Sequence, residues 1–182
     1  MKPFSVIVAF VMGIASCGSN EEASNIGDKE SSFERNPKEV VSDAGIDVEV
    51  FDFENFKPFI HQNDDKIHVI NFWATWCIPC VAELPYFEQL GAEYPEIEVV
   101  LVSLDFPKKI KENLIPFIQK NNLQSEVILL DEPDANKWIP QIDSTWSGAI
   151  PATIIYKNDK SQFYEQSFNF VELEVAIAAF KN

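Results

Sequence analysis

Two cysteines, Cys77 and Cys80, are separated by two residues in the segment NFWATWCIPCVAELP, which runs from Asn71 to Pro85. The residues that follow have helical spacing, so Cys77 is expected at the start of a helix. The free N–H groups and the dipole of a helix N-terminus stabilise a thiolate, and can lower a cysteine pKa from about 8.5 into the range of about 3.5–7.5. Cys80 would lie one turn further along the same face, within disulfide distance. The pattern predicts a redox pair in which Cys77 attacks a disulfide and Cys80 resolves the mixed disulfide.

Three other uses of the cysteine pair are weaker. A structural zinc site would need a second cysteine pair or histidines at ligand spacing, and His61 and His68 both precede the motif without such spacing. Covalent haem attachment would need a histidine directly after Cys80, where the chain has Val81. A purely structural disulfide that closes so short a loop would stabilise the fold little. The sequence thus predicts no metal and no cofactor other than the reversible disulfide between Cys77 and Cys80.

The third cysteine, Cys17, ends an N-terminal segment with the three regions of an export signal. Lys2 supplies a positive charge, an apolar run extends from Phe4 to Ile14, and two small residues precede the cysteine. The apolar run is too short to span a bilayer. The segment IASC resembles the lipobox of bacterial lipoproteins, which implies removal of residues 1–16 as a signal peptide and lipid attachment to Cys17. An ordinary secretory signal with an incidental cysteine is the alternative.

A lipid anchor would attach the protein to a membrane of the bacterial cell envelope, facing the periplasm or the exterior. Gly18 follows the cysteine where many inner-membrane lipoproteins of Gram-negative bacteria have Asp, which slightly favours the outer membrane. Residues 17–44 are rich in Ser, Asn, Glu, Gly and Pro and show no sustained apolar periodicity, so they are predicted to form a flexible linker. Within this linker, only Val40 and Val41 have the character of an element docked on the domain.

The bulk composition is compatible with one packed domain, expected over residues 45–182. The chain has 182 residues, of which 46% are hydrophobic, and this is sufficient for a core. Its 29 acidic and 14 basic residues give a formal charge of −15. Because an acidic surface repels phosphate backbones, nucleic acid is not an expected partner.

Strand-type and helix-type patterns alternate through this domain, and the chain ends in a hairpin followed by a helix. The predicted strands are 46–53, 66–74, 96–105, 126–131, 151–157 and 161–168, and the predicted helices are 54–63, 78–94, 107–123, 133–142 and 171–181. Asn158 and Asp159 supply the hairpin turn. This order predicts an α/β fold in which helices flank a mixed central β-sheet.

The motif VINFWATWCIPCVAELP closely resembles the active-site segment of the thioredoxin superfamily. The match is best to its membrane-anchored TlpA/ResA-like branch, which includes the CcmG-type reductases of cytochrome c maturation. A second segment, GAIPATIIY from Gly148 to Tyr156, resembles the loop in which the family places a cis-proline beside the cysteines. The resemblance implies a thioredoxin-like fold and thiol-disulfide oxidoreductase activity. It also implies protein disulfides as substrates and a membrane electron donor that re-reduces the cysteine pair.

The resemblance assigns roles to further residues. Trp76 matches the tryptophan that flanks and shields the reactive thiol. Pro151 matches the cis-proline, and Ile150 would offer its backbone groups to an extended substrate. Glu83 matches an acidic residue that tunes the thiols in the TlpA/ResA-like branch; without that match, an ordinary solvated glutamate would be the better interpretation.

One departure from the wider superfamily concerns proton transfer. Asn71 stands where many thioredoxins have a buried Asp. Because an amide takes no proton, proton transfer to or from Cys80 would fall to Glu83 or to water. The Ile-Pro pair between the cysteines also differs from the Gly-Pro of thioredoxin, so the sequence leaves the redox potential open.

These observations predict an extracytoplasmic thiol-disulfide oxidoreductase, more a reductase than an oxidant. A peroxiredoxin-like thiol peroxidase shares the fold, but it would need a Thr/Ser-x-x-Cys nucleophile and a supporting arginine. Here Thr75 lies two residues before Cys77, and Arg35, in the predicted linker, is the one arginine of the chain. A non-catalytic copper-binding module of this fold would use a histidine after the cysteine pair, and His61 and His68 both precede it.

Overall fold

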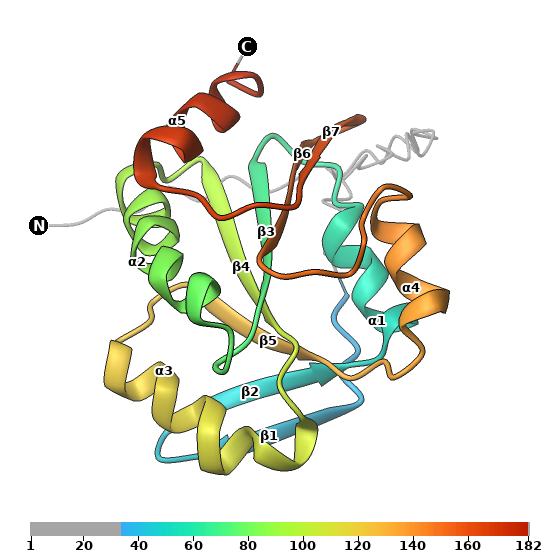
Figure 1. Ribbon diagram of the computed structural model, residues 1–182, viewed down its shortest axis with the longest axis vertical. Helices are drawn as coiled ribbons and strands as arrows, with labels where there is room; N and C mark the ends of the chain where they lie inside the picture. Colours follow the sequence, from blue (N-terminus) through green and yellow to red (C-terminus); the bar gives the residue numbers. More distant parts are fainter. Residues whose placement is uncertain (1–33, 182) are drawn as a thin grey trace, which may run out of the picture. The chain divides into compact units, whose positions relative to one another are not determined.

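The computed structural model describes residues 34–181, which fold around one seven-stranded sheet (Figure 1). The strands are β1 (Glu39–Asp43), β2 (Ile46–Phe51), β3 (Ile67–Trp73), β4 (Ile97–Ser103), β5 (Glu126–Leu130), β6 (Ala152–Lys157) and β7 (Lys160–Tyr164). The α-helices are α1 (Phe53–Phe56), α2 (Ile78–Glu93), α3 (Ile115–Asn121), α4 (Ala135–Ile142) and α5 (Phe170–Ala178). Among these described helices, none combines the length and the apolar character that a membrane span requires.

The strands lie in the order β1-β2-β5-β4-β3-β6-β7. The four central strands β2, β5, β4 and β3 are parallel, whereas β1 at one edge and β6 and β7 at the other pair antiparallel. Parallel neighbours need a crossover connection, which α2 supplies between β3 and β4 and α3 supplies between β4 and β5. The predicted α/β fold with a mixed central sheet is confirmed.

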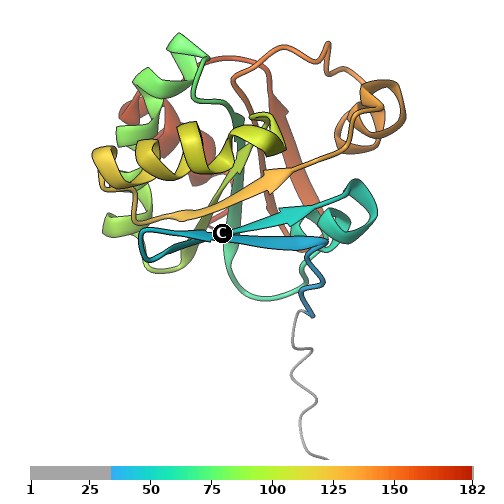
Figure 2. The same cartoon turned by 90° about the horizontal axis from the view of Figure 1, so that it is seen from below.

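Helices cover both faces of the sheet, so the domain formed by the described residues has three layers (Figures 1 and 2). Successive side chains of a strand point to opposite faces, and in β3 this sends Trp73 into the core under α2, α3 and α5 while Phe72 enters the core under α1 and α4. The second core is unusually aromatic and includes Phe51, Phe53, Phe56, Phe59, Phe72, Trp138 and Trp146. All seven residues of β3 are buried, as expected of a central strand covered on both faces.

The register of β3 places two chain segments together that are far apart in the sequence. β6 runs antiparallel to β3, and Ala152 pairs with Phe72. The residue before Ala152, Pro151, therefore lies at the sheet edge where β3 ends and the cysteine motif begins. Carboxyl ends of parallel strands are the usual location of sites in open α/β sheets.

The boundary of the domain differs from the prediction. Residues 17–44 were expected to be a flexible linker, but Glu39–Asp43 form β1, which pairs with β2 through a tight turn at Ala44 and Gly45, both with positive φ. Ahead of β1, Arg35 forms salt bridges with Glu49 and Glu126. The linker boundary at residue 45 is thus wrong within the described part. The signal peptide, Cys17 and the linker up to residue 33 lie outside the described residues.

The other elements follow the predicted order, with two local differences. The predicted helix 54–63 is a short α1 followed by a 3₁₀ turn over Lys57–Ile60. The predicted helix 107–123 consists of a 3₁₀ turn at Pro107–Lys109, a π-helical turn at Ile110–Leu114 and α3. The hairpin turn at Asn158 and Asp159 is confirmed by the pairing that flanks it and by the positive φ of Asn158.

Candidate redox site

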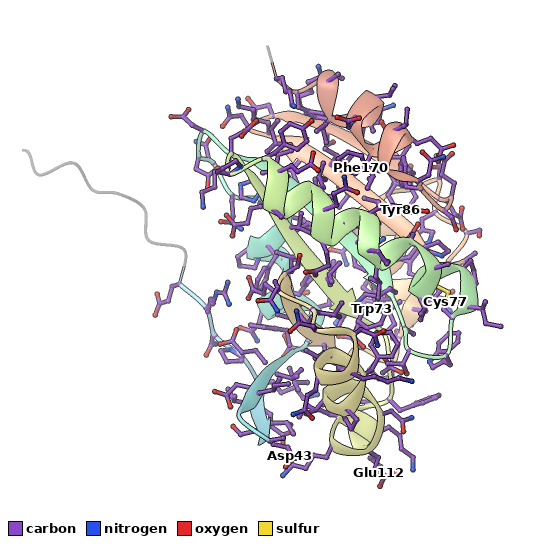
Figure 3. All side chains as sticks on the ribbon, turned by 90° about the vertical axis from the view of Figure 1, so that its left-hand side faces the viewer. Asp43, Trp73, Cys77, Tyr86, Glu112 and Phe170 are labelled. Atoms are coloured by element: carbon purple, nitrogen blue, oxygen red, sulfur yellow. A yellow bond between two sulfur atoms is a disulfide. The ribbon has the colours of Figure 1, made fainter. Side chains whose placement is uncertain are left out.

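Cys77 and Cys80 form a disulfide at the start of α2, and their Cα atoms are 5.3 Å apart (Figure 3). Cys77 is the N-cap of the helix and has an extended backbone, while Pro79 occupies the first turn, where its missing N–H is not needed. The backbone N–H of Cys80 points at Cys77 Sγ at 3.3 Å. A thiolate formed at Cys77 would accept this hydrogen bond, which stabilises the anion.

The two cysteines differ slightly in exposure, and their predicted roles as attacking and resolving cysteine stay predictions. Cys77 retains 6% exposure, whereas Cys80 has none. The side chains on either side of Cys77 are far more open, with Trp76 60% and Ile78 84% exposed. Trp76, which precedes Cys77 in the chain, is thus an exposed apolar side chain, and its predicted shielding of the thiol stays a prediction. Trp73, by contrast, is a core residue, packed against Phe117.

The proline loop lies against the cysteine pair. The Ile150–Pro151 peptide bond is cis, as expected from the resemblance. Cys77 Sγ lies 3.7 Å from the carbonyl oxygen of Ile150. Because a disulfide sulfur carries no proton, this is a contact and not a hydrogen bond. The expected proximity of Pro151 and Ile150 to Cys77 is present in the structure.

Glu83 is buried on the same helix, three residues after Cys80, and is only 1% exposed. Its Oε1 accepts a hydrogen bond from Asn71 Nδ2 at 2.9 Å, and its Oε2 accepts one from the backbone N–H of Phe168 at 2.8 Å. Burial raises the pKa of Glu83 from 4.5 to about 7, although the two hydrogen bonds act in the opposite direction. The alternative of a solvated glutamate is wrong.

The amide of Asn71 connects Glu83 to the sheet. Its Nδ2 also donates to Thr153 Oγ1 at 3.1 Å, so β3, β6 and α2 meet at this group. From the sequence, Asn71 was expected only to be unable to accept a proton, and no hydrogen bond to Glu83 was predicted. The hydrogen bond from the Phe168 backbone N–H to Glu83 was not predicted, because every residue except proline has such a donor and the sequence does not indicate which one is used.

The Asn71 amide should hold the Glu83 pKa down. In Asn71→Leu, the carboxylate loses one charge-assisted hydrogen bond, and we expect the Glu83 pKa to rise by about one to two pH units. Carbon-13 NMR of the labelled glutamate carboxyl in the oxidised protein measures this pKa. Thr153→Val removes only the other acceptor of the amide and should leave the Glu83 pKa within a few tenths. An unchanged pKa in Asn71→Leu would contradict the assignment.

The sequence also gave no role to Asp105, which follows β4 and is 3% exposed. Its carboxylate accepts hydrogen bonds from the backbone N–H of Thr75 at 3.0 Å and from Thr75 Oγ1 at 2.7 Å. Thr75 lies two residues before Cys77, so Asp105 belongs to the surroundings of the site. The next residue, Phe106, is 71% exposed.

His68, one of the two histidines weighed as metal ligands, lies at the beginning of β3, whereas the cysteine motif follows the end of that strand. It is buried, stacks on Tyr156 and bonds Asp64 at 2.9 Å through Nε2. These contacts show that His68 has a packing role in the sheet. It gives no support to a metal site that includes the cysteines.

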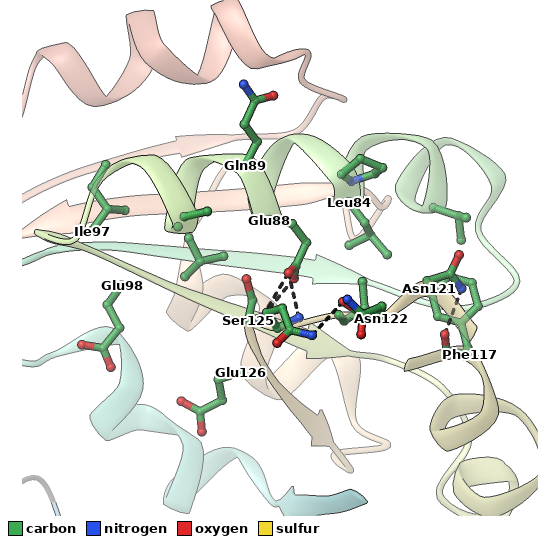
Figure 4. A pocket seen from close by; sticks show the side chains of 17 residues that line it. Leu84, Glu88, Gln89, Ile97, Glu98, Phe117, Asn121, Asn122, Ser125 and Glu126 are labelled. Carbon is green, nitrogen blue, oxygen red and sulfur yellow. Dashed lines mark hydrogen bonds between the residues drawn. The ribbon is translucent and has the colours of Figure 1, made fainter. Parts of the chain in front are cut away.

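A groove of about 800 Å³ lies between α2 and the segment from Phe117 to Glu126 (Figure 4). Its wall includes Leu84 and Phe117, and Glu88 reaches across it to accept hydrogen bonds from the backbone N–H groups of Gln124 and Ser125. Neither cysteine lines this groove. The redox pair is therefore not part of this groove.

The sheet order, the disulfide at the start of α2 and the cis-proline loop against it together define a thioredoxin fold. Residues 47–115 match the family model described as thioredoxin. The crystal structure of a DsbF homologue from Corynebacterium diphtheriae superposes with a TM-score of 0.54 at 19% identity, covering 92% of this chain and 99% of that chain; this likeness shows the fold alone.

Two curated relatives are similar in sequence. The chain is 51% identical over 49 residues to thiol-disulfide oxidoreductase ResA of Oceanobacillus iheyensis, a match that covers 26% of each chain. It is 35% identical over 88 residues to ResA of Bacillus cereus, covering 48% of this chain and 42% of the relative. The chain thus spans less than half the length of these relatives. It has a thioredoxin fold, and parts of it are similar in sequence to the thioredoxin family model and to ResA.

Proposed function

We propose that the protein is a thiol-disulfide oxidoreductase that reduces disulfide bonds of other proteins. The observation that carries the proposal is the asymmetry of the cysteine pair. Cys77 caps α2 and retains 6% exposure, whereas its disulfide partner Cys80 has none. In such a pair, the first cysteine can attack a substrate disulfide, and the second can then resolve the mixed disulfide. The similarity to ResA supports the same activity.

The chemistry is two successive exchanges. In the reduced protein, the Cys77 thiolate attacks one sulfur of a substrate disulfide, which forms a mixed disulfide and releases the other substrate sulfur as a thiolate. The Cys80 thiolate then attacks Cys77 Sγ, which closes the disulfide seen in the structure and releases the second substrate thiolate. Two electrons pass to the substrate, and its two thiolates take up protons. A dithiol donor must return two electrons, and Cys80 must regain its proton, before the next cycle.

Glu83 takes the proton of Cys80 in this proposal. The Cys80 thiol is buried, so it needs a nearby group that can accept its proton when it becomes a nucleophile. Glu83 lies one helical turn away, and its pKa of about 7 suits both uptake and release of a proton near neutral pH. The hydrogen bonds from Asn71 and Phe168 hold the carboxylate in place.

Polypeptides are the proposed substrate class because the surface beside Cys77 is apolar and open. Trp76 and Ile78, the chain neighbours of Cys77, are large hydrophobic side chains with most of their surface exposed. Exposed apolar patches of this kind favour contact with another protein. The backbone of Ile150, beside Cys77 Sγ, is placed to pair with an extended segment of the substrate.

The cellular setting forms a further part of the proposal. Its support is the lipobox-like segment IASC and the linker composition, both read from the sequence. The protein works in the bacterial cell envelope, held at a membrane by lipid on Cys17, and a membrane electron donor re-reduces it. Apocytochrome c is a candidate substrate, since the resemblance extends to CcmG-type reductases.

Substrate trapping tests the function. In Cys80→Ser the second exchange cannot occur, so the reduced variant should form a stable mixed disulfide between Cys77 and an insulin chain. Non-reducing electrophoresis and mass spectrometry detect this adduct. The double variant Cys77→Ser/Cys80→Ser is the control and should form none, with Cys17→Ala present in both chains to remove the third thiol. An adduct in the double variant, or its absence from Cys80→Ser, would rule out the proposed order of attack.

A further inference from the structure

Asp105 is a buried carboxylate that serves the loop before the reactive cysteine. It accepts hydrogen bonds from Thr75 N, from Thr75 Oγ1 and, at 2.9 Å, from Ser103 Oγ. None of the salt bridges among residues 34–181 includes it. A buried carboxylate without a cationic partner is costly unless hydrogen bonds satisfy it, and two of these three come from one threonine.

The anchoring end of this contact is rigid. Trp73 pairs with Ser103 in the sheet, and the backbone N–H of Leu104 donates to the Trp73 carbonyl at 2.8 Å. Ser103 Oγ also accepts the backbone N–H of Asp105 at 3.1 Å. The Asp105 carboxylate is therefore held against the end of β3, the strand from which the cysteine loop departs.

The loop itself is short and is held at three places. Its first residue, Ala74, follows β3, and its last, Cys77, caps α2. A turn hydrogen bond of 3.1 Å joins Cys77 N to Ala74 O. Between these ends, the described contacts of Thr75 with Asp105 fix the middle of the loop.

We propose that Asp105 and Thr75 form a clamp that positions Cys77 for attack on a disulfide. The proposal rests on the thiol-disulfide exchange function argued above. Attack requires the incoming thiolate to align with the sulfur–sulfur bond, and a misplacement of about 1 Å can cost about a hundredfold in rate. In the reduced protein the bond to Cys80 is absent. The clamp then maintains the path of the backbone that carries the nucleophile.

The test compares two substitutions of one residue. Thr75→Val keeps the size of the side chain and the backbone N–H but removes the hydroxyl donor, whereas Thr75→Ser keeps the hydroxyl. The rate constant for reaction of each fully reduced chain with the small aromatic disulfide DTNB is measured by stopped flow, with Cys17→Ala in every chain to remove the third thiol. It is read at the high-pH plateau, where Cys77 is fully thiolate and a change of its pKa has no effect. We expect Thr75→Val to be about tenfold slower than wild type and Thr75→Ser to stay within about twofold.

Asp105→Ala removes both contacts to Thr75 and should be slower than Thr75→Val. Asp52→Ala is its matched control, because Asp52 also accepts a backbone N–H, that of Asn55, but caps α1 on the other face of the sheet. The control should lose thermal stability without a change in the DTNB rate. If Asp105→Ala does not fold, the two Thr75 variants still decide the question.

Two outcomes would overturn the clamp: a wild-type rate in Thr75→Val, or a loss in Thr75→Ser as large as in Thr75→Val. If the contact between Asp105 and Thr75 were purely structural, Asp105→Ala and Asp52→Ala would both have a lower melting temperature, and neither would change the DTNB rate at the high-pH plateau. The proposed function is tested separately by insulin. A wild-type chain that reacts with DTNB but does not reduce insulin would refute the polypeptide substrate and leave the clamp comparison valid.

Discussion

Cys77→Ser should abolish the reduction of insulin disulfides by dithiothreitol that the wild-type chain catalyses. Serine lacks the thiolate that attacks the substrate, and the buried Cys80 has no exposed surface from which to replace it. Loss of a nucleophile generally costs orders of magnitude, so we expect a fall of roughly a thousandfold or more, to the uncatalysed rate. The turbidity of the precipitating insulin B chain measures turnover.

Cys80→Ser supplies the contrast in the same assay. It should also lose catalytic turnover. In a Cys17→Ala background, which removes the third thiol, the reduced Cys80→Ser variant should still consume one equivalent of DTNB through Cys77, and Cys77→Ser should not react at a comparable rate. Far-ultraviolet circular dichroism checks that both variants are folded. Equal residual turnover in the two variants, or rapid DTNB reaction in Cys77→Ser, would reverse or remove the assigned roles.

Glu83→Gln should change how stability depends on pH. The pKa of Glu83 is about 7 in the fold and 4.5 at its ordinary value, so the folded state binds more protons than the unfolded state between these pH values. The free energy of unfolding of the wild type therefore decreases as pH rises from about 4.5 to above 7, by at most about 3 kcal/mol from this group. Glutamine does not titrate, so Glu83→Gln should lack this decrease. Urea unfolding of the oxidised chain across this pH range measures it.

The matched control is Glu93→Gln, an exposed glutamate on the same helix. Its pH profile should follow that of the wild type. In the reduced protein, an anionic Glu83 opposes ionisation of the nearby Cys80 thiol, so Glu83→Gln should also shift the alkylation of Cys80 to lower pH. Superimposable stability profiles and alkylation profiles for wild type and Glu83→Gln would exclude a titrating role.

The sequence was informative wherever a chemical requirement fixes residue type and spacing. Cys77 and Cys80 were found from a two-residue gap at a helix start, and Pro151 from the segment that resembles the family loop. The periodicity of β3 and α2 also located the scaffold that carries them. Glu83 was placed on the face of Cys80 by its helical spacing, although its burial could not be read from one helix alone. That burial depends on packing against the segment that contains Phe168.

The features that were missed depend on contacts between distant segments. Asp105 and Thr75 are thirty residues apart and meet only because β3 and β4 are parallel neighbours. β1 was allowed only as an alternative to the linker, around Val40 and Val41, because an edge strand with four of its five residues exposed carries no alternating pattern. Its pairing is provided by β2 and by the turn at Ala44 and Gly45, whose positive φ values are not typical of alanine.

The distribution of tryptophans gives the site an optical reporter of its own. Trp73, Trp138 and Trp146 are buried in the two cores, whereas Trp76 stands open to solvent next to Cys77. An aqueous collisional quencher such as iodide can reach an exposed indole far more readily than a buried one. The quenchable part of the intrinsic fluorescence of these residues therefore originates beside the disulfide. Binding of a partner to that surface can therefore be measured as a loss of iodide quenching of the Trp76 fluorescence, without attaching a dye or changing a residue.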